Sequence, residues 1–306
     1  MLRKHLINHD LIDSTIVFDG LVFEEANVDT SIIHLNSFHK TNSFYWGKIQ
    51  PNNLESIKFF PRDCEEIANE NRYEIFEYLG ETWKGIKAKI KLKSIPLSEL
   101  RKISLGMKLK GNSNYIVSEK TESHPDNILF GKDLGYYEKP KRNNYFSWTD
   151  SLKIGGTQRH EVYLSNPKIL IQAIRNLSLE RRIVATIDEE TSYFIGTVNG
   201  LTKLNSSTDF IIDEYFLLAI INSKLINFFF KSQFTTISLT ASFLGVIPVK
   251  ITDEKTQKDI GDNVRILMSS KNDEARKALI DEIDNSVFEL YDLTEKEVQY
   301  IKKANA

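Results

Sequence analysis

The sequence predicts a mixed α/β fold, and three observations support this fold class. The chain of 306 residues is 41% apolar, which is enough to bury a core, and it holds only 14 glycines and 7 prolines. Short runs rich in β-branched and aromatic residues recur between polar segments, as expected for strands. Longer segments with apolar residues at helical spacing follow in the second half of the chain. Regular structure should therefore dominate.

The N-terminal region is expected to open with the end of a helix at 2–9 and a pair of strands. The strands are "STIVFD" (14–19) and "DTSIIHLN" (29–36), joined by a loop through "FEEAN". "TNSFYWGKI" (41–49) is a candidate further strand, and 62–78 reads as an acidic helix. An isolated hairpin is marginal in water. Either later residues cover the opening strands, or the chain begins in the middle of a domain.

The middle of the chain is less regular. In "WKGIKAKIKLKSIPLSEL" (83–100) lysines alternate with apolar residues, and this period of two predicts a strand that ends at Pro96. Ser98 is expected to cap a short helical turn. Residues 104–161 are rich in Gly, Asn, Lys and Tyr without a clear period. Irregular stretches of this length inside a compact domain are usually functional or disordered, and the many aromatics argue against disorder.

Regular structure is expected to return after Pro167. The helix at 213–231 has Asp213 as its N-cap, and Thr294 with Glu297 forms a capping box near the C-terminus. The remaining predicted elements are a strand in "KILIQAI" (168–174), a hairpin in "RIVATIDEETSYFIGTV" (182–198) with its tip near "DEET", a strand in "LGVIPVKI" (244–251) and two helices within 272–303.

The net charge of −2 hides a strong asymmetry along the chain. Residues 1–83 carry 7 Lys/Arg and 14 Asp/Glu, a net of −7; residues 84–182 carry 20 against 9, a net of +11; residues 183–306 carry 13 against 19, a net of −6. A basic block repels itself unless something anionic lies opposite. The block is therefore either a lysine-rich solvated face or a surface that binds a polyanion.

Several kinds of chemistry are not expected. No GxG follows a strand, no NPPY-like tetrapeptide occurs, and Walker loops and zinc spacings are absent. Asp188, Glu189 and Glu190 are predicted to be a solvated turn rather than a metal cluster. Cys64 is the only cysteine, so no internal disulfide forms, and its acidic helix should raise the thiol pKa. The longest apolar run is too short to cross a membrane. We therefore expect a soluble, cytoplasmic chain without catalytic residues, metal or cofactor of its own.

Three segments, taken in order, resemble a known family. They are "PKILIQAIRNLSLERRIVATIDEETSYF" (167–194), "DEYFLLAIINSKLINFFFK" (213–231) and "LGVIPV" (244–249). They look like the TaqI-type C-terminal specificity domain, which is the target-recognition domain of gamma-class adenine-specific DNA methyltransferases and of type IIG restriction-modification enzymes. The tail at 280–303 resembles the terminal helices of such enzymes.

The opening of that domain is also recognisable. "ISLGMKLKGNSNYIVSE" (103–119) is similar to the family pattern G-x-x-T-G-x-N-x-x-F. Leu109 and Lys110 stand where the family has threonine, and Tyr115 takes the place of the phenylalanine. Together, the order and spacing of these segments extend the resemblance over most of 100–303.

The resemblance implies a division of the chain. Residues 1–83 look like the C-terminal remnant of a Rossmann-like methyltransferase domain with a connector, 84–250 like the target-recognition domain, and 251–306 like a helical tail. S-adenosylmethionine would then belong to the parent enzyme, and Met1 would begin a fragment or one half of a split enzyme. The strand residues Ile16, Phe18, Ile32 and Leu35 should be covered by a methyltransferase catalytic domain or subunit, or by a second copy of the chain.

The resemblance also implies that double-stranded DNA is the partner. Lysine and arginine would contact phosphates, asparagine would read adenine edges and arginine guanine edges. The candidate DNA-binding residues are Lys108, Lys110, Gly111, Asn112, Asn114, Lys139, Lys141, Arg142, Asn143, Asn144, Tyr145, Arg175, Arg181 and Arg182. Tyr115, Tyr145 and Trp148 are either stacking residues or core. Two alternatives are a protein- or RNA-interaction subunit with a basic face, and an enzyme with an unfamiliar site.

Overall fold

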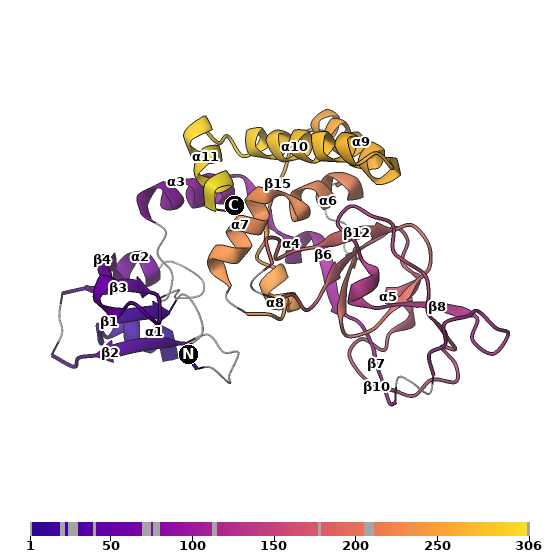
Figure 1. Ribbon diagram of the computed structural model, residues 1–306, viewed down its shortest axis with the longest axis horizontal. Coiled ribbons are helices and arrows are strands. Elements are labelled where there is room, and N and C mark those ends of the chain that lie inside the picture. The colour runs from indigo at the N-terminus through magenta and orange to yellow at the C-terminus, as the bar shows by residue number, and fades with distance from the viewer. Residues whose placement is uncertain are drawn as a thin grey trace. The chain divides into compact units, whose positions relative to one another are not determined.

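The computed structural model describes residues 2–18, 22–23, 30–38, 41–68, 75, 80–111, 115–176, 179–204, 211–234 and 236–304. The chain divides into two compact units, Met1–Glu81 (unit 1) and Thr82–Ala306 (unit 2). Each unit contains both helices and strands (Figure 1), so the predicted mixed α/β fold class is confirmed. The finer division at 83 and 250 stays a prediction.

Unit 1 is built on a four-stranded sheet in the order β2-β1-β3-β4. Its strands are β1 (Ile12–Phe18), β2 (Ser31–Leu35), β3 (Ser43–Ile49) and β4 (Lys58–Asp63), and the 3-10 turn η1 (Leu54–Ser56) precedes β4. β1 runs antiparallel to β2 and parallel to β3. The two predicted opening strands are thus confirmed, with β1 inside the sheet rather than at its edge.

Two short helices enclose the small core of unit 1. They are α1 (Leu2–Asn8) and α2 (Cys64–Ala68), and they contribute Leu6, Ile7 and Ile67 to the same buried cluster as Ile12. The acidic helix predicted over 62–78 is confirmed at 64–68, while residues 69–74 and 76–79 lie outside the described residues. Burial, followed by the nearby carboxylates of Asp10 and Asp63, raises the pKa of Cys64 to about 11, as expected.

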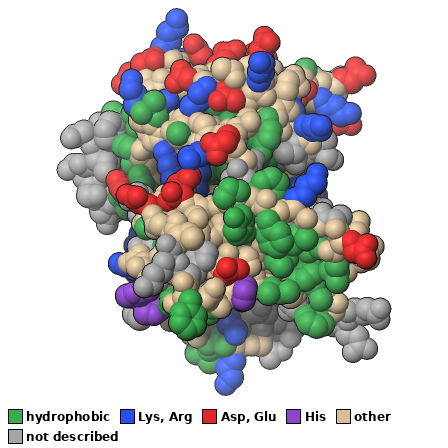
Figure 2. Space-filling model, turned by 90° about the vertical axis from the view of Figure 1, so that its left-hand side faces the viewer, with side chains coloured by type: hydrophobic (Ala, Val, Ile, Leu, Met, Phe, Trp, Pro, Cys, Tyr) green, Lys and Arg blue, Asp and Glu red, His purple; other side chains and the backbone are tan. Residues whose placement is uncertain are grey.

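Apolar side chains of unit 1 remain exposed. Ile32 faces Ile16 across the β1–β2 pair, and Ile32 and Leu35 are 49% and 52% exposed. Ile16 and Phe18 are partly buried. Figure 2 shows hydrophobic side chains gathered on the face of the molecule that it draws, and Tyr45, Phe59 and Phe60 of unit 1 are exposed as well. The apolar side chains expected to lie uncovered are therefore more exposed on β2 than on β1.

Unit 2 is organised by a four-stranded antiparallel sheet in the order β12-β11-β14-β6. Its strands are β6 (Arg101–Leu105), β11 (Lys168–Gln172), β12 (Ala185–Asp188) and β14 (Val198–Lys203). Because side chains alternate between the faces of a strand, Ile169 and Ile171 enter one hydrophobic cluster and Leu170 enters another. The central sheet thus separates two cores, which we call the helical side and the loop side.

The helical side is covered by the C-terminal helices. These are α6 (Glu214–Asn222), α7 (Lys224–Gln233), α8 (Ala241–Leu244), α9 (Glu254–Ser269), α10 (Asp273–Leu290) and α11 (Glu295–Ala304). α6 packs against β12, α9 and α10. The Asp213 carboxylate accepts hydrogen bonds from the backbone N–H of Tyr215 and Phe216, which confirms the predicted N-cap. Thr294 and Glu297 also form the predicted capping box.

Two details of the helices differ from the sequence prediction. The helix expected over 213–231 is two helices, because Ser223 ends α6 and its hydroxyl caps α7 through the N–H of Ile226. α9 was not predicted. The strand expected in "LGVIPVKI" is confirmed as β15 (Pro248–Lys250), which pairs with β5 (Ser94–Pro96).

The lysine-alternating segment is a helix, so the predicted strand is wrong. α3 (Gly80–Lys91) buries Trp83, Ile86 and Ile90, whose spacing places them on one face of a helix. The apparent alternation came from Ala88 and Leu92, which are both exposed. A single-turn helix, α4 (Leu97–Leu100), follows β5, so the expected helical turn is confirmed. Ser98 does not cap it, because Ser98 lies inside the helix and the N-cap position is Pro96, which makes no side-chain cap.

The loop side contains short strands and long irregular connections. One small sheet has the order β13-β8-β9, and another pairs β10 with β7. The elements are β7 (Lys108–Leu109), β8 (Asp126–Leu129), the 3-10 turn η3 (Gly131–Asp133), β9 (Tyr145–Phe146), β10 (Lys153–Gly155), α5 (His160–Leu164) and β13 (Tyr193–Phe194). β12 and β13 lie in different sheets, so the hairpin predicted over 182–198 is wrong.

Candidate nucleic-acid interface

The irregular stretch predicted over 104–161 forms most of the loop side. β7 and β10 lie at the end of unit 2 opposite α9 and α10 (Figure 1). A second hydrophobic cluster supports these loops, and it includes Ile128, Phe146 and Phe194. Tyr115 and Trp148 pack against this cluster while remaining partly exposed. Both aromatics are therefore part of the loop-side core.

Residues 138–145, which we call the anchored loop, carry several of the candidate DNA-binding residues. Lys139, Lys141 and Asn143 are exposed. Asn144 and Tyr145 are partly buried, since the Asn144 side chain donates to Asp133 Oδ2 at 3.3 Å and the Tyr145 hydroxyl donates to the carbonyl of Arg142 at 3.1 Å. The loop therefore presents two lysines and one amide outward, and uses the last two residues for its own structure.

Arg142 points into the protein rather than away from it. Its Nη2 lies 2.5 Å from Asp188 Oδ1, and its Nε lies 3.3 Å from the hydroxyl of Ser192. Asp188 also pairs with Lys168, whose Nζ lies 2.8 Å from Oδ2. The side chains of Asp188 and Lys168 are 0% exposed and that of Arg142 is 22% exposed. We call these three residues the Asp188 cluster.

The Asp188 cluster corrects the interpretation of "DEET" as a solvated turn. Glu189 and Glu190 are exposed, but Asp188 is the last residue of β12 and lies on the buried side of the turn. Burial lowers the pKa of Lys168, and the adjacent Asp188 carboxylate opposes this shift. A buried carboxylate persists when cations and hydrogen-bond donors surround it. Here Lys168 and Arg142 supply both charges.

A second group of candidates lies at the turn after β7. Lys108 and Lys110 are exposed on either side of buried Leu109. The Lys110 N–H donates to the carbonyl of Leu152 at 2.9 Å, which ties the turn to the segment before β10. Gly111 has φ of +63°, a conformation that a side chain rarely adopts. Asn112 and Asn114 lie outside the described residues.

Two of the three candidate arginines between β11 and β12 make structural contacts. Arg182 is fully buried and donates to the backbone carbonyls of Arg175 and Thr236. It is therefore not available to DNA, and its assignment as a DNA-binding residue is wrong. Arg181 donates to the Tyr136 hydroxyl at 2.7 Å, with its guanidinium 4.0 Å from the centre of that ring. Adjacent arginines in a basic stretch gave no sign of this division.

Arg175 borders a groove on the loop side. Its Nε donates to the carbonyl of Arg181 and its Nη1 to Gln172 Oε1 at 2.7 Å, and it remains partly exposed. The groove has a volume of about 460 Å³ and is also lined by Lys132, Asn176 and Thr197. Arg175 therefore combines structural hydrogen bonds with a position at the edge of this groove, and its assignment as a DNA-binding residue stays a prediction.

A layered aromatic group was not identified from the sequence. The ring of Trp148 stacks on His160 at 4.6 Å and on Tyr193 at 5.2 Å, and His160 Nε2 lies 2.7 Å from the Tyr193 hydroxyl. Lys153 covers Trp148, with its ammonium 4.1 Å from the ring centre. Burial raises the pKa of Tyr193 to about 12. The group holds α5 and β10 on the loop side.

The +11 block does not form one solvated face. Arg101 is buried against Glu214 at 2.7 Å, and Lys89 on α3 pairs with Glu297 at the same distance. Lys168 and Arg182 are buried as described above. The lysines of the block that are exposed on loop-side segments are Lys108, Lys110, Lys120, Lys132, Lys139 and Lys141. Positive charge in the block is thus divided between structural pairs and exposed loop residues.

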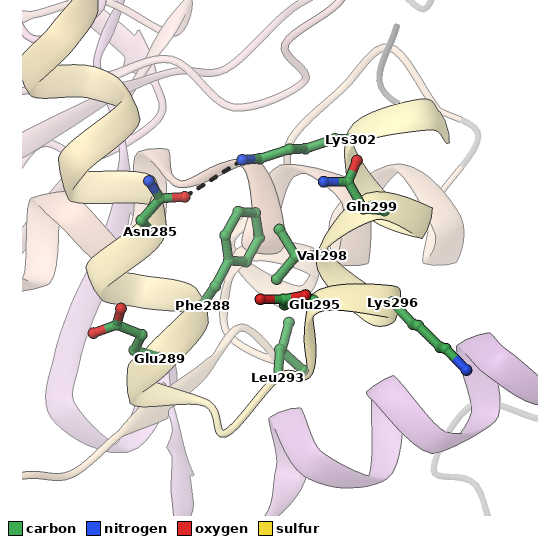
Figure 3. Close-up of a pocket in the computed structure, with 9 residues that line it drawn as sticks. All are labelled: Asn285, Phe288, Glu289, Leu293, Glu295, Lys296, Val298, Gln299 and Lys302. Carbon is green, nitrogen blue, oxygen red and sulfur yellow. Dashed lines mark hydrogen bonds between the residues drawn. The ribbon is translucent and has the colours of Figure 1, made fainter.

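A larger pocket lies between α10 and α11. It has a volume of about 790 Å³ (Figure 3). Its walls include Phe288 and Val298, and Asn285 Oδ1 accepts a hydrogen bond from Lys302 at 3.4 Å. Glu289 and Glu295 also line it, so its charge is mixed and does not favour a polyanion. Over the described ranges, no group of three His, Cys, Asp or Glu side chains is arranged to hold a metal ion, and no helix is long and apolar enough to cross a membrane.

Comparison with known families identifies the segment that carries the anchored loop. Residues 126–249 match the family model of the TaqI-like C-terminal specificity domain. This segment runs from β8 to β15, and it includes the Asp188 cluster and three strands of the central sheet. The resemblance predicted from the sequence is confirmed here. No curated protein matches the chain.

One solved structure of a restriction-modification enzyme shares the fold. The structure of the type IIL restriction-modification enzyme MmeI in complex with DNA matches with a TM-score of 0.55 and 11% identity, over 96% of this chain and 45% of that chain. The chain thus spans less than half of the solved MmeI chain. The HsdS subunit from Thermoanaerobacter tengcongensis matches at a TM-score of 0.39 and 11% identity, over 69% of this chain and 51% of that one.

Proposed function

We propose that this chain is the specificity part of a restriction-modification enzyme and recognises a sequence in double-stranded DNA. The observation that carries the proposal is the position of the anchored loop. The loop lies within the segment that matches a specificity domain, and it exposes Lys139, Lys141 and Asn143. Lysines suit phosphates and an asparagine amide suits the edge of adenine.

The candidate residues now divide by role. Exposed Lys108, Lys110, Lys139 and Lys141 are proposed to contact phosphates, with Gly111 allowing a close approach of the backbone. Asn143 is proposed to read a base edge. The alternative of a protein- or RNA-interaction subunit is less well supported, because the matched family is a specificity domain of this enzyme class.

The chemistry of the parent enzyme is proposed to lie elsewhere. The sequence has neither a glycine-rich cofactor loop nor an NPPY-like tetrapeptide, so we expect calorimetry to detect no binding of S-adenosylmethionine. We further propose that the parent is an adenine-specific methyltransferase or a type IIG enzyme. The exposed side chains of β2 would then be covered by its catalytic part or by a second copy. Light scattering of Ile32→Glu tests self-association, which should fall.

The proposal is tested by the salt dependence of duplex binding. Fluorescence anisotropy of a labelled 20-base-pair duplex, titrated from low to high KCl, should give a log–log slope that steepens by about 0.9 per phosphate contacted. Selection from a pool of random duplexes should then enrich a short common sequence. Binding that is insensitive to salt, or tighter binding to single-stranded RNA than to duplex DNA, would contradict the proposal.

A further inference from the structure

Arg142 stands apart from the other basic residues of the anchored loop. Lys139 and Lys141 are exposed, whereas the Arg142 guanidinium reaches Asp188 Oδ1 and the Ser192 hydroxyl inside the protein. Its Nε also lies 3.3 Å from Glu190 Oε2. A contact with a DNA phosphate would require the guanidinium to leave these partners. Breaking a buried, hydrogen-bonded ion pair is costly, so direct DNA binding by Arg142 is disfavoured.

The charges around Arg142 balance without a ligand. Two cations, Arg142 and Lys168, face two carboxylates, Asp188 and Glu190. Lys168 also donates to the carbonyls of Ser165 and Glu190, both at 3.2 Å. Asp188 therefore keeps a buried cationic partner even when Arg142 is replaced. Substitution of Arg142 should loosen the loop without stranding a buried charge.

The backbone of the anchored loop is fastened on both sides of Arg142. The Lys141 N–H donates to the carbonyl of Asp133 at 2.9 Å, and the Tyr145 N–H donates to the carbonyl of Val117 at 2.8 Å. Thr186, on β12, donates its hydroxyl to the carbonyl of Glu138. Arg142 is the one point at which a side chain of this loop is ion-paired to the end of β12 within the described residues. The loop has no helix or strand over 138–144, so these contacts define its shape.

We propose that Arg142 is a positioning residue that fixes Lys139, Lys141 and Asn143 for DNA by joining the anchored loop to Asp188. The inference deepens the proposed function and rests on it. Ordering a loop before binding removes part of the entropy that binding would otherwise cost. The central sheet would thus set the geometry of a surface that is itself irregular.

A double-mutant cycle tests this inference on the full chain with a labelled 20-base-pair duplex. The variants are Arg142→Met, the pair Lys139→Ala with Lys141→Ala, and the triple change. The lysine pair should flatten the salt slope by about 1.8, because two phosphate contacts are lost. Arg142→Met alone should weaken binding roughly tenfold. In the triple variant, the added Arg142→Met should change the slope no further and should weaken binding less than tenfold, because both lysines are gone and only Asn143 is left to position.

Arg142→Lys separates the two roles of a positive charge. A lysine keeps the charge but cannot reproduce the planar fork that meets Asp188 and Ser192. If Arg142 is a positioning residue, Arg142→Lys should weaken duplex binding as much as Arg142→Met does. If Arg142 contacts a phosphate directly, Arg142→Lys should retain the wild-type slope, and the triple variant should lose a further slope of about 0.9. Either of these results overturns the inference.

Hydrogen exchange of the free protein provides a readout that needs no DNA. In Arg142→Met and Arg142→Lys, the amides of Lys141 and Tyr145 should exchange faster, while those of α9 and α10 should not change. In the lysine pair all of these amides should stay as in the wild type. Unchanged exchange at Lys141 and Tyr145 would overturn the inference that Arg142 holds the anchored loop in place. If the wild type fails to bind duplex DNA but both Arg142 variants show the faster exchange, the proposed function is wrong, while Arg142 still holds the anchored loop in place.

Discussion

The two sides of the central sheet in unit 2 are held together by different physical means. On the helical side, α6 and α7 contribute an almost continuous set of buried apolar residues, including Leu218, Ile220 and Phe230. On the loop side a smaller apolar cluster is joined by a few polar contacts, chiefly the Asp188 cluster and Asp133. Apolar contact is non-directional, whereas an ion pair or hydrogen bond fixes the direction of a chain segment.

This difference suggests how a recognition surface can be both irregular and ordered. Few residues of the anchored loop are needed for its shape, because Arg142, Asn144 and Tyr145 make the inward contacts. Lys139, Lys141 and Asn143 stay exposed and make none of these contacts. The exposed positions could therefore change without cost to the fold, while the helical side keeps the sheet in place.

The largest expected effect on stability is that of Asp188→Ala. The change leaves the buried Lys168 ammonium without its carboxylate, which typically costs about 3–5 kcal/mol. Urea unfolding should show a large fall in the midpoint. Glu190→Gln is the matched control, because the Glu190 side chain is 70% exposed, and it should have little effect. A small effect of Asp188→Ala would mean that polar contacts do not hold the loop side.

The helical side should respond to loss of volume. Leu218 on α6 is fully buried, and Leu218→Ala should cost about 2–5 kcal/mol through lost apolar contact and a cavity. Ile266→Ala on α9 is the control, since Ile266 is largely exposed. Urea unfolding checks both. At low urea, where the Leu218→Ala protein is still folded, its salt slope for duplex binding should equal that of the wild type; a changed slope would mean that the two sides are not separable.

Exposed lysines on the two sides should differ in DNA binding and not in stability. Lys139→Ala with Lys141→Ala should change the free energy of unfolding by less than about 0.5 kcal/mol, yet flatten the salt slope by about 1.8. Lys255→Ala with Lys277→Ala, on α9 and α10, removes the same charge from exposed positions of the helical side. Its slope should stay at the wild-type value, and equal losses from both pairs would refute a localised interface.

The smallest expected effect is a pH dependence on the helical side. Burial raises the pKa of Asp284 above 3.8 in the folded state, with Lys224 opposing the shift. The folded state therefore holds this proton more tightly than the unfolded state does. The resulting stability is fully present below about pH 4 and is lost as pH rises through the raised pKa.

Asp284→Asn should remove this dependence. The midpoint of urea unfolding of the wild type, relative to Asp284→Asn, should then be highest below about pH 4 and decline as pH rises through the raised pKa of Asp284. Asp281→Asn is the control, because its exposed carboxylate pairs with the same Lys224. A difference that grows with pH would show that Asp284 is stabilised as a carboxylate, and that the Lys224 contacts outweigh burial.

The sequence predicted the apolar parts of this fold better than the polar ones. β11 and α10 have clear periods, and the caps at Asp213 and Thr294 are local hydrogen-bond motifs. The errors arose where a period was short, or where one segment fitted both a strand period and a helix period. The segment 83–100 matched a period of two only through Ala88 and exposed Leu92, and the burial of Ile86 and Ile90 could not be seen without the fold.

The candidate site was only partly predictable for a related reason. Exposed Lys139 and inward-facing Arg142 are neighbours in one basic stretch, and no local pattern distinguishes them. Their roles depend on Asp188, which lies 46 residues from Arg142 and reaches it through the central sheet. Arg182 was misassigned in the same way, since it is buried and its partners are the backbone carbonyls of Arg175 and of the distant Thr236. The matched family segment supports the proposed class of function without giving the roles of these residues.

The proposed binding of DNA by the loop side of the central sheet can be tested by hydrogen exchange of the full chain with and without duplex DNA. We expect slower exchange in the described segments 108–111 and 138–145 when duplex is bound, and no change in α9 or α10. Protection of α9 and α10, with 138–145 unchanged although the duplex is bound, would contradict it.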